Sequence, residues 1–248
     1  MKIETVGMLG GGVMGSGIAQ SLAVGGVKVI VRDMNDDMLA KSRATIVDGR
    51  YGLERGVERG KTSREDADGA LSRLSWTTDA KDLAHVDLVI EAVPEDLDLK
   101  KKVWAEIDGV AKADALFATN TSGLVISELN KAVSDARRPK FVGMHFFSPV
   151  PVMKLVEIII APETAEETIA AIEDVCSRMG KATVRAKDAP GRYGFIANRI
   201  YFAAVREAQA VLKEGIATPE DINKAMVMGF NWPVGPLAMI EGATKGWQ

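Results

Sequence analysis

The feature that most constrains this chain is a glycine motif between an apolar run and a helical pattern near the N-terminus. The apolar run over residues 3–9 stops at Gly10-x-Gly12-x-x-Gly15, and apolar residues then recur at helical spacing before a second apolar run at 27–31. A strand, a glycine turn, a helix and a second strand in this order predict a βαβ unit that binds a dinucleotide at the helix N-terminus. A plain glycine turn is the alternative.

Each position of this motif has a physical role. Gly10 allows a tight turn, Gly12 lets the backbone approach a pyrophosphate, and Gly15 allows the helix to pack closely on the strand. Val13 and Met14 open the helix, where unpaired backbone N–H groups and the positive end of the helix dipole can face phosphates. These five positions are therefore predicted to bind the cofactor.

Asp33 ends the second predicted strand, 23 residues after Gly10. This spacing suits the acidic residue that accepts hydrogen bonds from the adenosine ribose. Its charge would repel the 2′-phosphate of NADP, so the sequence favours NAD. The neighbouring Arg32 could still turn toward such a phosphate, and Asp33 could instead simply begin a turn before Asn35.

Further apolar runs alternate with amphipathic stretches along the chain. The runs cover residues 88–92, 115–118, 141–145, 155–160 and 182–184, and the amphipathic stretches include 97–110 and 165–179. Strands that alternate with helices predict an α/β fold of the Rossmann type, with a doubly wound and mainly parallel sheet.

The segment between the second strand and a short apolar run at 74–76 is longer than one crossover helix needs. Helical patterns at its two ends predict an inserted helical hairpin over about residues 37–74. Its middle carries Arg55, Arg59 and Lys61 among glycines and acidic residues. A solvated helix face with ion pairs is the plainest interpretation of these charges.

The composition shifts again near residue 186. Residues 187–191 read Lys-Asp-Ala-Pro-Gly, which is typical of a linker, and three helical patterns follow. We therefore expect a Rossmann domain at 1–186, followed by a smaller all-α domain at 190–248.

The composition also excludes several classes of function. Lys and Arg total 31 against 34 for Asp and Glu, a net charge of −3, and no basic stretch could follow a nucleic-acid backbone. No apolar run is long enough to cross a bilayer, and the N-terminus lacks the pattern of a signal peptide. The only cysteine, Cys176, is assigned to core packing. We expect a cytoplasmic protein with no disulfide, no metal site, and no membrane or nucleic-acid partner.

Only two histidines are available as a general base near neutral pH. His85 lies in a polar turn and is assigned to the surface. His145 ends an apolar run, and Glu157 interrupts another, where an unpaired carboxylate would be costly. If the chain turns back at 149–151, Glu157 can lie beside His145 and orient it as a catalytic base. A core histidine satisfied by the backbone and an exposed edge-strand glutamate are the alternatives.

Small polar residues follow the apolar run at 115–118. Asn120 and Ser122 would lie at the carboxyl edge of the sheet, where open sheets bind ligands, and could hold a substrate oxygen. An ordinary turn also explains these residues. Asn198, a polar residue within a predicted helix, could likewise either bind the substrate or have no functional role.

Five segments together resemble the L-3-hydroxyacyl-CoA dehydrogenase family, including its bacterial 3-hydroxybutyryl-CoA dehydrogenase branch. They are GGGVMGSGIAQ at 10–20, VIEAVPED at 89–96, NTS at 120–122, HFFSPVPVMKLVEI at 145–158 and GFIANR at 194–199. They follow each other in the order of the family, and the resemblance covers nearly the whole chain.

The resemblance implies NAD-dependent, reversible oxidation of a short-chain L-3-hydroxyacyl-CoA to the 3-ketoacyl-CoA, as in fatty acid β-oxidation. His145 resembles the catalytic base and Glu157 the carboxylate that orients it. Ser122 and Asn198 resemble the groups that bind the reacting oxygen. The positions that match contacts to the nicotinamide half of NAD are Glu95, Lys100 and Asn120.

The sequence departs from the family at three places. Ser148 stands where the family usually has Asn, so a hydrogen bond from an amide there is lost or bridged by water. The inserted segment clasps the CoA tail in the family, and Arg55, Arg59 and Lys61 suit CoA phosphates without matching family positions. The chain ends at Gln248 after fewer helices than the family has, so the domain through which the family forms homodimers is expected to be shortened.

Two other functions fit parts of the pattern. A dehydrogenase of a free hydroxy acid, of the carnitine or gulonate type, would use the same base without a CoA arm. A non-catalytic NAD-binding protein of the crystallin type would need the fold and not the site, which the presence of all four catalytic candidates argues against. The chain could also be one part of a multifunctional β-oxidation protein.

Overall fold

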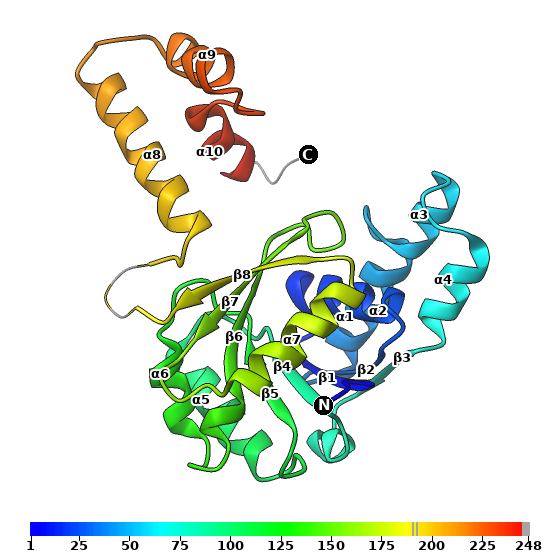
Figure 1. Ribbon diagram of the computed structural model, residues 1–248. Helices are drawn as coiled ribbons and strands as arrows, with labels where there is room; N and C mark the ends of the chain where they lie inside the picture. The colour runs from blue at the N-terminus through cyan, green and yellow to red at the C-terminus, as the bar shows by residue number, and fades with distance from the viewer. Residues whose placement is uncertain (190, 192, 245–248) are drawn as a thin grey trace. The chain divides into compact units, whose positions relative to one another are not determined.

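One mixed sheet carries most of the N-terminal part of the chain (Figure 1). The computed structural model describes residues 1–189, 191 and 193–244, in two compact units, Met1–Gly191 and Arg192–Gln248. Within the described residues, eight strands lie in the order β3-β2-β1-β4-β5-β6-β7-β8, parallel except for the antiparallel pair β6–β7. The strands are β1 (Thr5–Leu9), β2 (Lys28–Arg32), β3 (Leu74–Thr77), β4 (Leu88–Glu91), β5 (Leu116–Thr119), β6 (Phe141–Phe146), β7 (Leu155–Ile160) and β8 (Ala182–Lys187).

Helices α1 (Val13–Val24) and α7 (Glu166–Arg178) cover one face of this sheet. Leu22 of α1 and Ile172 of α7 belong to the same buried cluster as Met8 of β1, and neighbouring strands add alternate residues to it, because successive strand side chains point to opposite faces. The predicted Rossmann-type, mainly parallel sheet is therefore confirmed.

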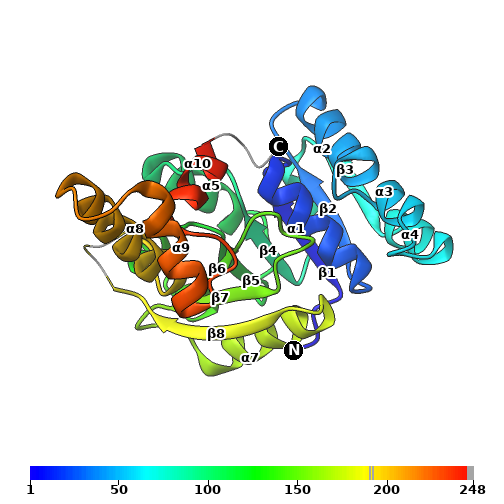
Figure 2. The same cartoon turned by 90° about the horizontal axis from the view of Figure 1, so that it is seen from above.

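Helix α5 (Leu97–Asp108) packs on the opposite face of the strands from α7 (Figure 2). Its Trp104 is fully buried and lies 4.8 Å from the ring of Phe117 and 4.9 Å from that of Phe141, measured between ring centroids. This aromatic cluster anchors α5 to β5 and β6. A short helix α6 (Ile126–Leu129) and three 3₁₀ helices (Ala80–Leu83, Asn130–Ala132 and Arg138–Lys140) complete the unit.

The predicted inserted hairpin contains a third helix. It comprises α2 (Asp36–Asp48), α3 (Leu53–Glu58) and α4 (Arg64–Leu71). The side chains of Asn35 and Ser63 cap α2 and α4 by accepting backbone hydrogen bonds. The sequence pattern missed α3 because this six-residue helix buries only Leu53, which leaves no apolar period to detect.

The second unit is helical. It consists of α8 (Ala197–Lys213), α9 (Pro219–Phe230) and α10 (Pro236–Thr244). Thr218 caps α9 by accepting from the backbone N–H of Asp221, and Asn223 accepts from the first N–H groups of α10. In the ranges that the structure describes, no helix combines the length and the apolar character needed to cross a membrane.

Candidate active site

The glycine motif forms the turn from β1 into α1 at the carboxyl edge of the sheet. Gly10 has a φ of +91°, and a Cβ added to Gly15 would lie 1.8 Å from the carbonyl oxygen of Gly10, so both positions require glycine. A Cβ on Gly12 would meet nothing within 4 Å, which leaves open space at the helix N-terminus. Val13 beside it is 75% exposed. Backbone N–H groups that face open space at a helix start fit the phosphates of a dinucleotide.

Asp33 lies at the end of β2 and holds this loop. One carboxylate oxygen accepts from the backbone N–H of Gly11 at 2.7 Å, and the other accepts from Met34 at the same distance. The guanidinium of Arg32 instead binds Glu106 of α5 at 3.2 Å. In this arrangement the charge beside the glycine loop is the carboxylate of Asp33, which disfavours a 2′-phosphate.

His145 and Glu157 lie opposite each other in the antiparallel pair β6–β7. The Nδ1 atom of His145 lies 2.8 Å from Oε2 of Glu157, and both side chains are almost completely buried. The chain does turn back between the two strands, as the Pro149-Val150-Pro151 segment suggested. The structure thus brings together the two groups that the sequence proposed as a base and its orienting carboxylate.

Asn120 and Ser122 follow β5 at the same edge. Asn120 is 9% exposed, and its Oδ1 accepts from the backbone N–H of Phe146, directly after His145. The backbone N–H of Ser122 donates to Oε1 of Glu95 at 2.8 Å, and the hydroxyl of Thr121 donates to the same oxygen. The loop after β5 is therefore tied both to the loop after β4 and to the strand that carries the histidine.

Lys100, which the family resemblance assigns to the nicotinamide half of NAD, is only 1% exposed. Its ammonium group donates to Glu91 at 2.5 Å and to the backbone carbonyl of Val93 at 3.0 Å, and it lies 3.4 Å from Glu95. Burial raises the pKa of Glu91, against the influence of Lys100 and the hydroxyl of Thr119, which favour the charged carboxylate.

Basic residues surround a hollow of about 560 Å³ beside the inserted helices. Its basic lining residues are Arg50, Arg55, Arg59, Lys61, Lys154 and Lys181, and none of its lining residues is acidic. Lys181 is 8% exposed and donates to the backbone carbonyls of Val150 and Met153. Burial, and then the charge of Lys154, lowers the pKa of Lys181. Such a hollow suits a ligand with several negative charges.

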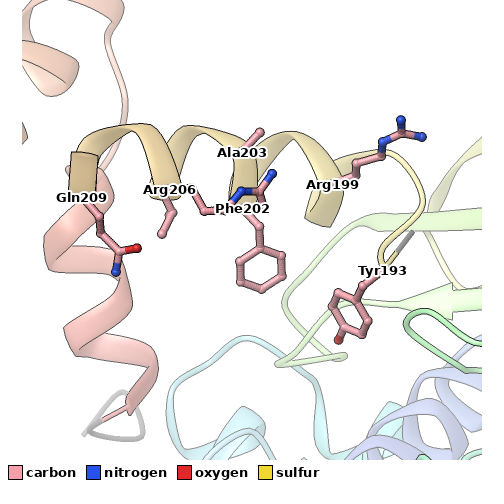
Figure 3. Close-up of a pocket in the computed structure, with 7 residues that line it drawn as sticks. Tyr193, Arg199, Phe202, Ala203, Arg206 and Gln209 are labelled. Carbon is pink, nitrogen blue, oxygen red and sulfur yellow. The ribbon is translucent and has the colours of Figure 1, made fainter. Parts of the chain in front are cut away.

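Asn198 lies in the first turn of α8 and so belongs to the other unit. A hollow of similar size runs along this helix (Figure 3). Its lining residues are Tyr193, Arg199, Phe202, Ala203, Val205, Arg206 and Gln209. The arginines and Phe202 are spaced at intervals of three and four residues on α8, and all three line the hollow.

Two family models match the chain, one for each unit. Residues 5–189 match the model described as 3-hydroxyacyl-CoA dehydrogenase, NAD binding domain. Residues 194–247 match the model described as 3-hydroxyacyl-CoA dehydrogenase, C-terminal domain. The chain belongs to the 3-hydroxyacyl-CoA dehydrogenase family.

Relatives of this dehydrogenase cover nearly all of it. The mitochondrial hydroxyacyl-coenzyme A dehydrogenase of Rattus norvegicus is 40% identical over 242 residues, which are 96% of this chain and 76% of the relative. A 3-hydroxybutyryl-CoA dehydrogenase of Mycobacterium tuberculosis is 40% identical over 96% of this chain and 81% of its own length. The crystal structure of (S)-3-hydroxybutyryl-CoA dehydrogenase from Ralstonia eutropha aligns with a TM-score of 0.90 and 42% identity, over 96% of this chain and 81% of that one.

Membership in the 3-hydroxyacyl-CoA dehydrogenase family confirms the family resemblance and the prediction of NAD as cofactor. Sequence reasoning missed Glu91, although it ends an apolar strand just as Glu157 interrupts one, and that signal could have found it. It also missed Lys154 and Lys181 as parts of the basic hollow. No sequence signal links these two lysines to the inserted helices, because the fold alone brings them together.

Proposed function

We propose that this enzyme oxidises the 3-hydroxyl group of short-chain L-3-hydroxyacyl-CoA thioesters, such as 3-hydroxybutyryl-CoA, to the 3-ketoacyl-CoA with NAD, and catalyses the reverse reaction. The observation that carries the proposal is the buried His145–Glu157 pair at the carboxyl edge of an NAD-binding sheet. Open α/β sheets bind their ligands at this edge, so His145 lies where a base could reach the substrate. A place in fatty acid β-oxidation follows from this chemistry.

The residues have distinct roles in the proposed reaction. An ionised Glu157 can only accept, so Nδ1 of His145 carries the proton that they share, and Nε2 is the atom that takes the proton of the substrate hydroxyl. NAD, held at the glycine loop and Asp33, would supply the acceptor for the hydride from C3. Glu157 then stabilises the imidazolium, and the hydroxyl of Ser122 holds the reacting oxygen by a hydrogen bond.

Replacing the proposed base tests this function. His145→Gln should lower kcat for NADH-dependent reduction of acetoacetyl-CoA by about 10²- to 10⁴-fold, the usual contribution of a general base. His85 is the only other histidine and is exposed, so His85→Gln is a matched control that should keep wild-type activity. Turnover by His145→Gln at the wild-type rate would contradict the assignment of His145 as the base and would mean that another group takes the proton.

The basic hollow supports a CoA substrate over a free hydroxy acid. Arg55, Arg59 and Lys61 all line it, and a CoA tail carries phosphates that suit these cations. The double variant Arg59→Ala/Lys61→Ala should raise KM for acetoacetyl-CoA about tenfold or more, and should leave KM unchanged for acetoacetyl-N-acetylcysteamine, which lacks phosphates. Faster turnover of free 3-hydroxy acids than of thioesters by the wild-type protein would instead favour the carnitine or gulonate type.

The helical unit supports a homodimer. Exposed apolar side chains lie on α8 and α9, among them Ile200 at 65%, Met228 at 77% and Phe230 at 72%. We propose that these side chains pack against a second copy of the chain, as apolar helix faces do in obligate dimers. We also propose that the protein works in the reducing cytoplasm. Light scattering should give twice the mass of the chain, and the double variant Met228→Ser/Phe230→Ser should shift the protein toward monomer.

A further inference from the structure

Glu91 sits at the centre of a buried polar network that neither the family match nor the proposed mechanism uses. It is fully buried at the end of β4, and its carboxylate accepts three hydrogen bonds. The donors are the backbone N–H of Val93 at 2.8 Å, the ammonium of Lys100 at 2.5 Å and the hydroxyl of Thr119 at 2.7 Å. A carboxylate is kept in such a place only where it has full partners.

Lys100 connects Glu91 to the surface of the site. An ammonium group has three protons, and three acceptors lie around that of Lys100: Glu91, the carbonyl of Val93 and, at 3.4 Å, Glu95. Two of its donors are thus used by Glu91 and Val93, and Glu95 lies within ion-pair distance. Lys100 therefore contributes to the site by holding the carboxylate of Glu95, whose side chain is 40% exposed.

Glu95 in turn holds the loop that carries Ser122. Its Oε2 faces Lys100, while its Oε1 accepts from the hydroxyl of Thr121 and the backbone N–H of Ser122. The same hydroxyl oxygen of Thr121 accepts from the backbone N–H of Leu124 at 2.9 Å, which closes the turn. One oxygen of Glu95 therefore faces Lys100 and the other binds the turn at 121–124. The position of this turn depends on where Lys100 holds the carboxylate.

We propose that Glu91 is a positioning residue of this enzyme, which fixes the Ser122 loop through Lys100 and Glu95. The inference rests on the proposed function only in so far as Ser122 binds the reacting oxygen. A fixed hydroxyl is needed because a misplaced group binds the transition state poorly. Glu91 itself touches neither substrate nor cofactor in this role.

The double variant Glu91→Gln/Lys100→Met separates positioning from stability. It removes both buried charges together, which in proteins is often neutral for stability, whereas removing one leaves an unpaired charge. We expect a melting temperature within a few degrees of wild type, with amide exchange at 121–124 about tenfold faster and kcat for acetoacetyl-CoA about tenfold lower. Wild-type exchange and kcat in this variant would overturn the proposal.

Thr119→Val is the matched control, because it removes a buried hydrogen bond to the other oxygen of Glu91 and leaves the pair with Lys100 intact. It should lower the melting temperature with exchange at 121–124 within about twofold of wild type. Equal loosening of the loop in this control would mean a general loss of stability and would contradict a positioning role.

Glu95→Gln decides the matter if the double variant does not fold. Residue 95 lies at the surface, and glutamine keeps the shape of the glutamate side chain but lacks the charge that faces Lys100. The rate of amide exchange at 121–124 should therefore rise again. An unchanged rate of exchange would overturn the proposal. Exchange is measured without substrate. If the wild-type protein does not turn over acyl-CoA, the proposed function is wrong. The exchange measurement still tests the positioning role of Glu91.

Discussion

His145 and Glu157 are direct cross-strand partners in β6–β7, with Nδ1 and Oε2 2.8 Å apart and both side chains almost completely buried. The register places them there: a shift of one residue would send one side chain to the opposite face of the sheet. Their pairing is thus a property of how β6 and β7 align and does not depend on a mobile loop. A base held by two strands has its ring orientation fixed by the sheet, and the carboxylate beside Nδ1 favours the tautomer with the proton on that atom.

Glu157→Gln should lower kcat while the protein still binds NADH. The amide has the size of the carboxylate but cannot stabilise an imidazolium, and it can present an N–H to Nδ1 and so favour the wrong tautomer. We expect kcat for acetoacetyl-CoA to fall about 10²- to 10⁴-fold with the Kd for NADH within about threefold of wild type. Steady-state kinetics and NADH fluorescence titration measure the two. A kcat within threefold of wild type would show that Glu157 does not orient the base.

Asp33→Asn should weaken the preference for NAD over NADP. The carboxylate is the charge beside the glycine loop, while Arg32 is bound to Glu106. We expect the ratio of the Kd values for NADPH and NADH to fall about tenfold, because a full charge no longer faces the 2′-phosphate.

The control for this prediction is Glu106→Gln, which frees Arg32 and leaves Asp33 in place. It should change the ratio of Kd values by less than threefold. If Glu106→Gln alone moved the ratio as far as Asp33→Asn, Arg32 would be the residue that sets the cofactor preference.

Cys176 should not react in the native protein. The thiol is fully buried on α7, and burial raises its pKa to about 12, so the reactive thiolate is absent at neutral pH. Titration with Ellman's reagent should find less than about a tenth of a thiol per chain in native buffer and one in 6 M guanidinium chloride. Rapid labelling of the native protein would show that α7 opens readily from the sheet.

The sequence predicted the parts of this fold in which local pattern and final structure agree. The glycine motif has one structural solution after a strand and before a helix, and Gly10 and Gly15 have contacts that exclude a Cβ. Glu157 was assigned to His145 because a carboxylate in an apolar run needs a partner, and only two histidines were available. In both cases the sequence contains a feature that is unfavourable in most structures, and few structures relieve it.

The remaining features depend on contacts between distant segments, which a single sequence does not reveal. Lys181 joins the basic hollow because β8 returns beside β7, far along the chain from Arg55 of α3 and the neighbouring Arg59. The contacts of Lys100 with Glu91 and Glu95 were not foreseen either, and its expected contact with the cofactor stays a prediction. The assignment of Asn198 to the reacting oxygen stays a prediction, as does the homodimer.

Arg137→Met should destabilise the Rossmann unit strongly without changing the site. The guanidinium of Arg137 is 4% exposed, lies 4.4 Å over the ring of Phe117, and donates to Asp108 and to several backbone carbonyls. Methionine fills the space but leaves Asp108 without its cation, so the free energy of unfolding should fall by about 3–5 kcal/mol. Urea unfolding measures the loss. A decrease below about 1 kcal/mol would mean that water replaces the guanidinium at no cost.

Asp108→Asn should show how this ion pair depends on pH. Burial acts to raise the pKa of Asp108, but hydrogen bonds from Arg137 and from the backbone N–H of Ser134 outweigh it and hold the pKa below its usual value. A carboxyl whose pKa is lower in the folded state stabilises the protein above the pKa of the unfolded chain, about 3.9, and loses that contribution as pH falls through the folded value.

The difference in unfolding free energy between wild type and Asp108→Asn should therefore be about 1.5–3 kcal/mol and constant from pH 7 to pH 5, and should shrink below about pH 4. Urea unfolding at each pH measures it, with Asp174→Asn, an exposed aspartate, as the control for loss of one charge. The shrinkage has a simple origin, since protonated Asp108 cannot pair with Arg137 any better than asparagine can. A difference that grew as pH fell would contradict the lowered pKa and the role of the carboxylate in holding Arg137 over the ring of Phe117.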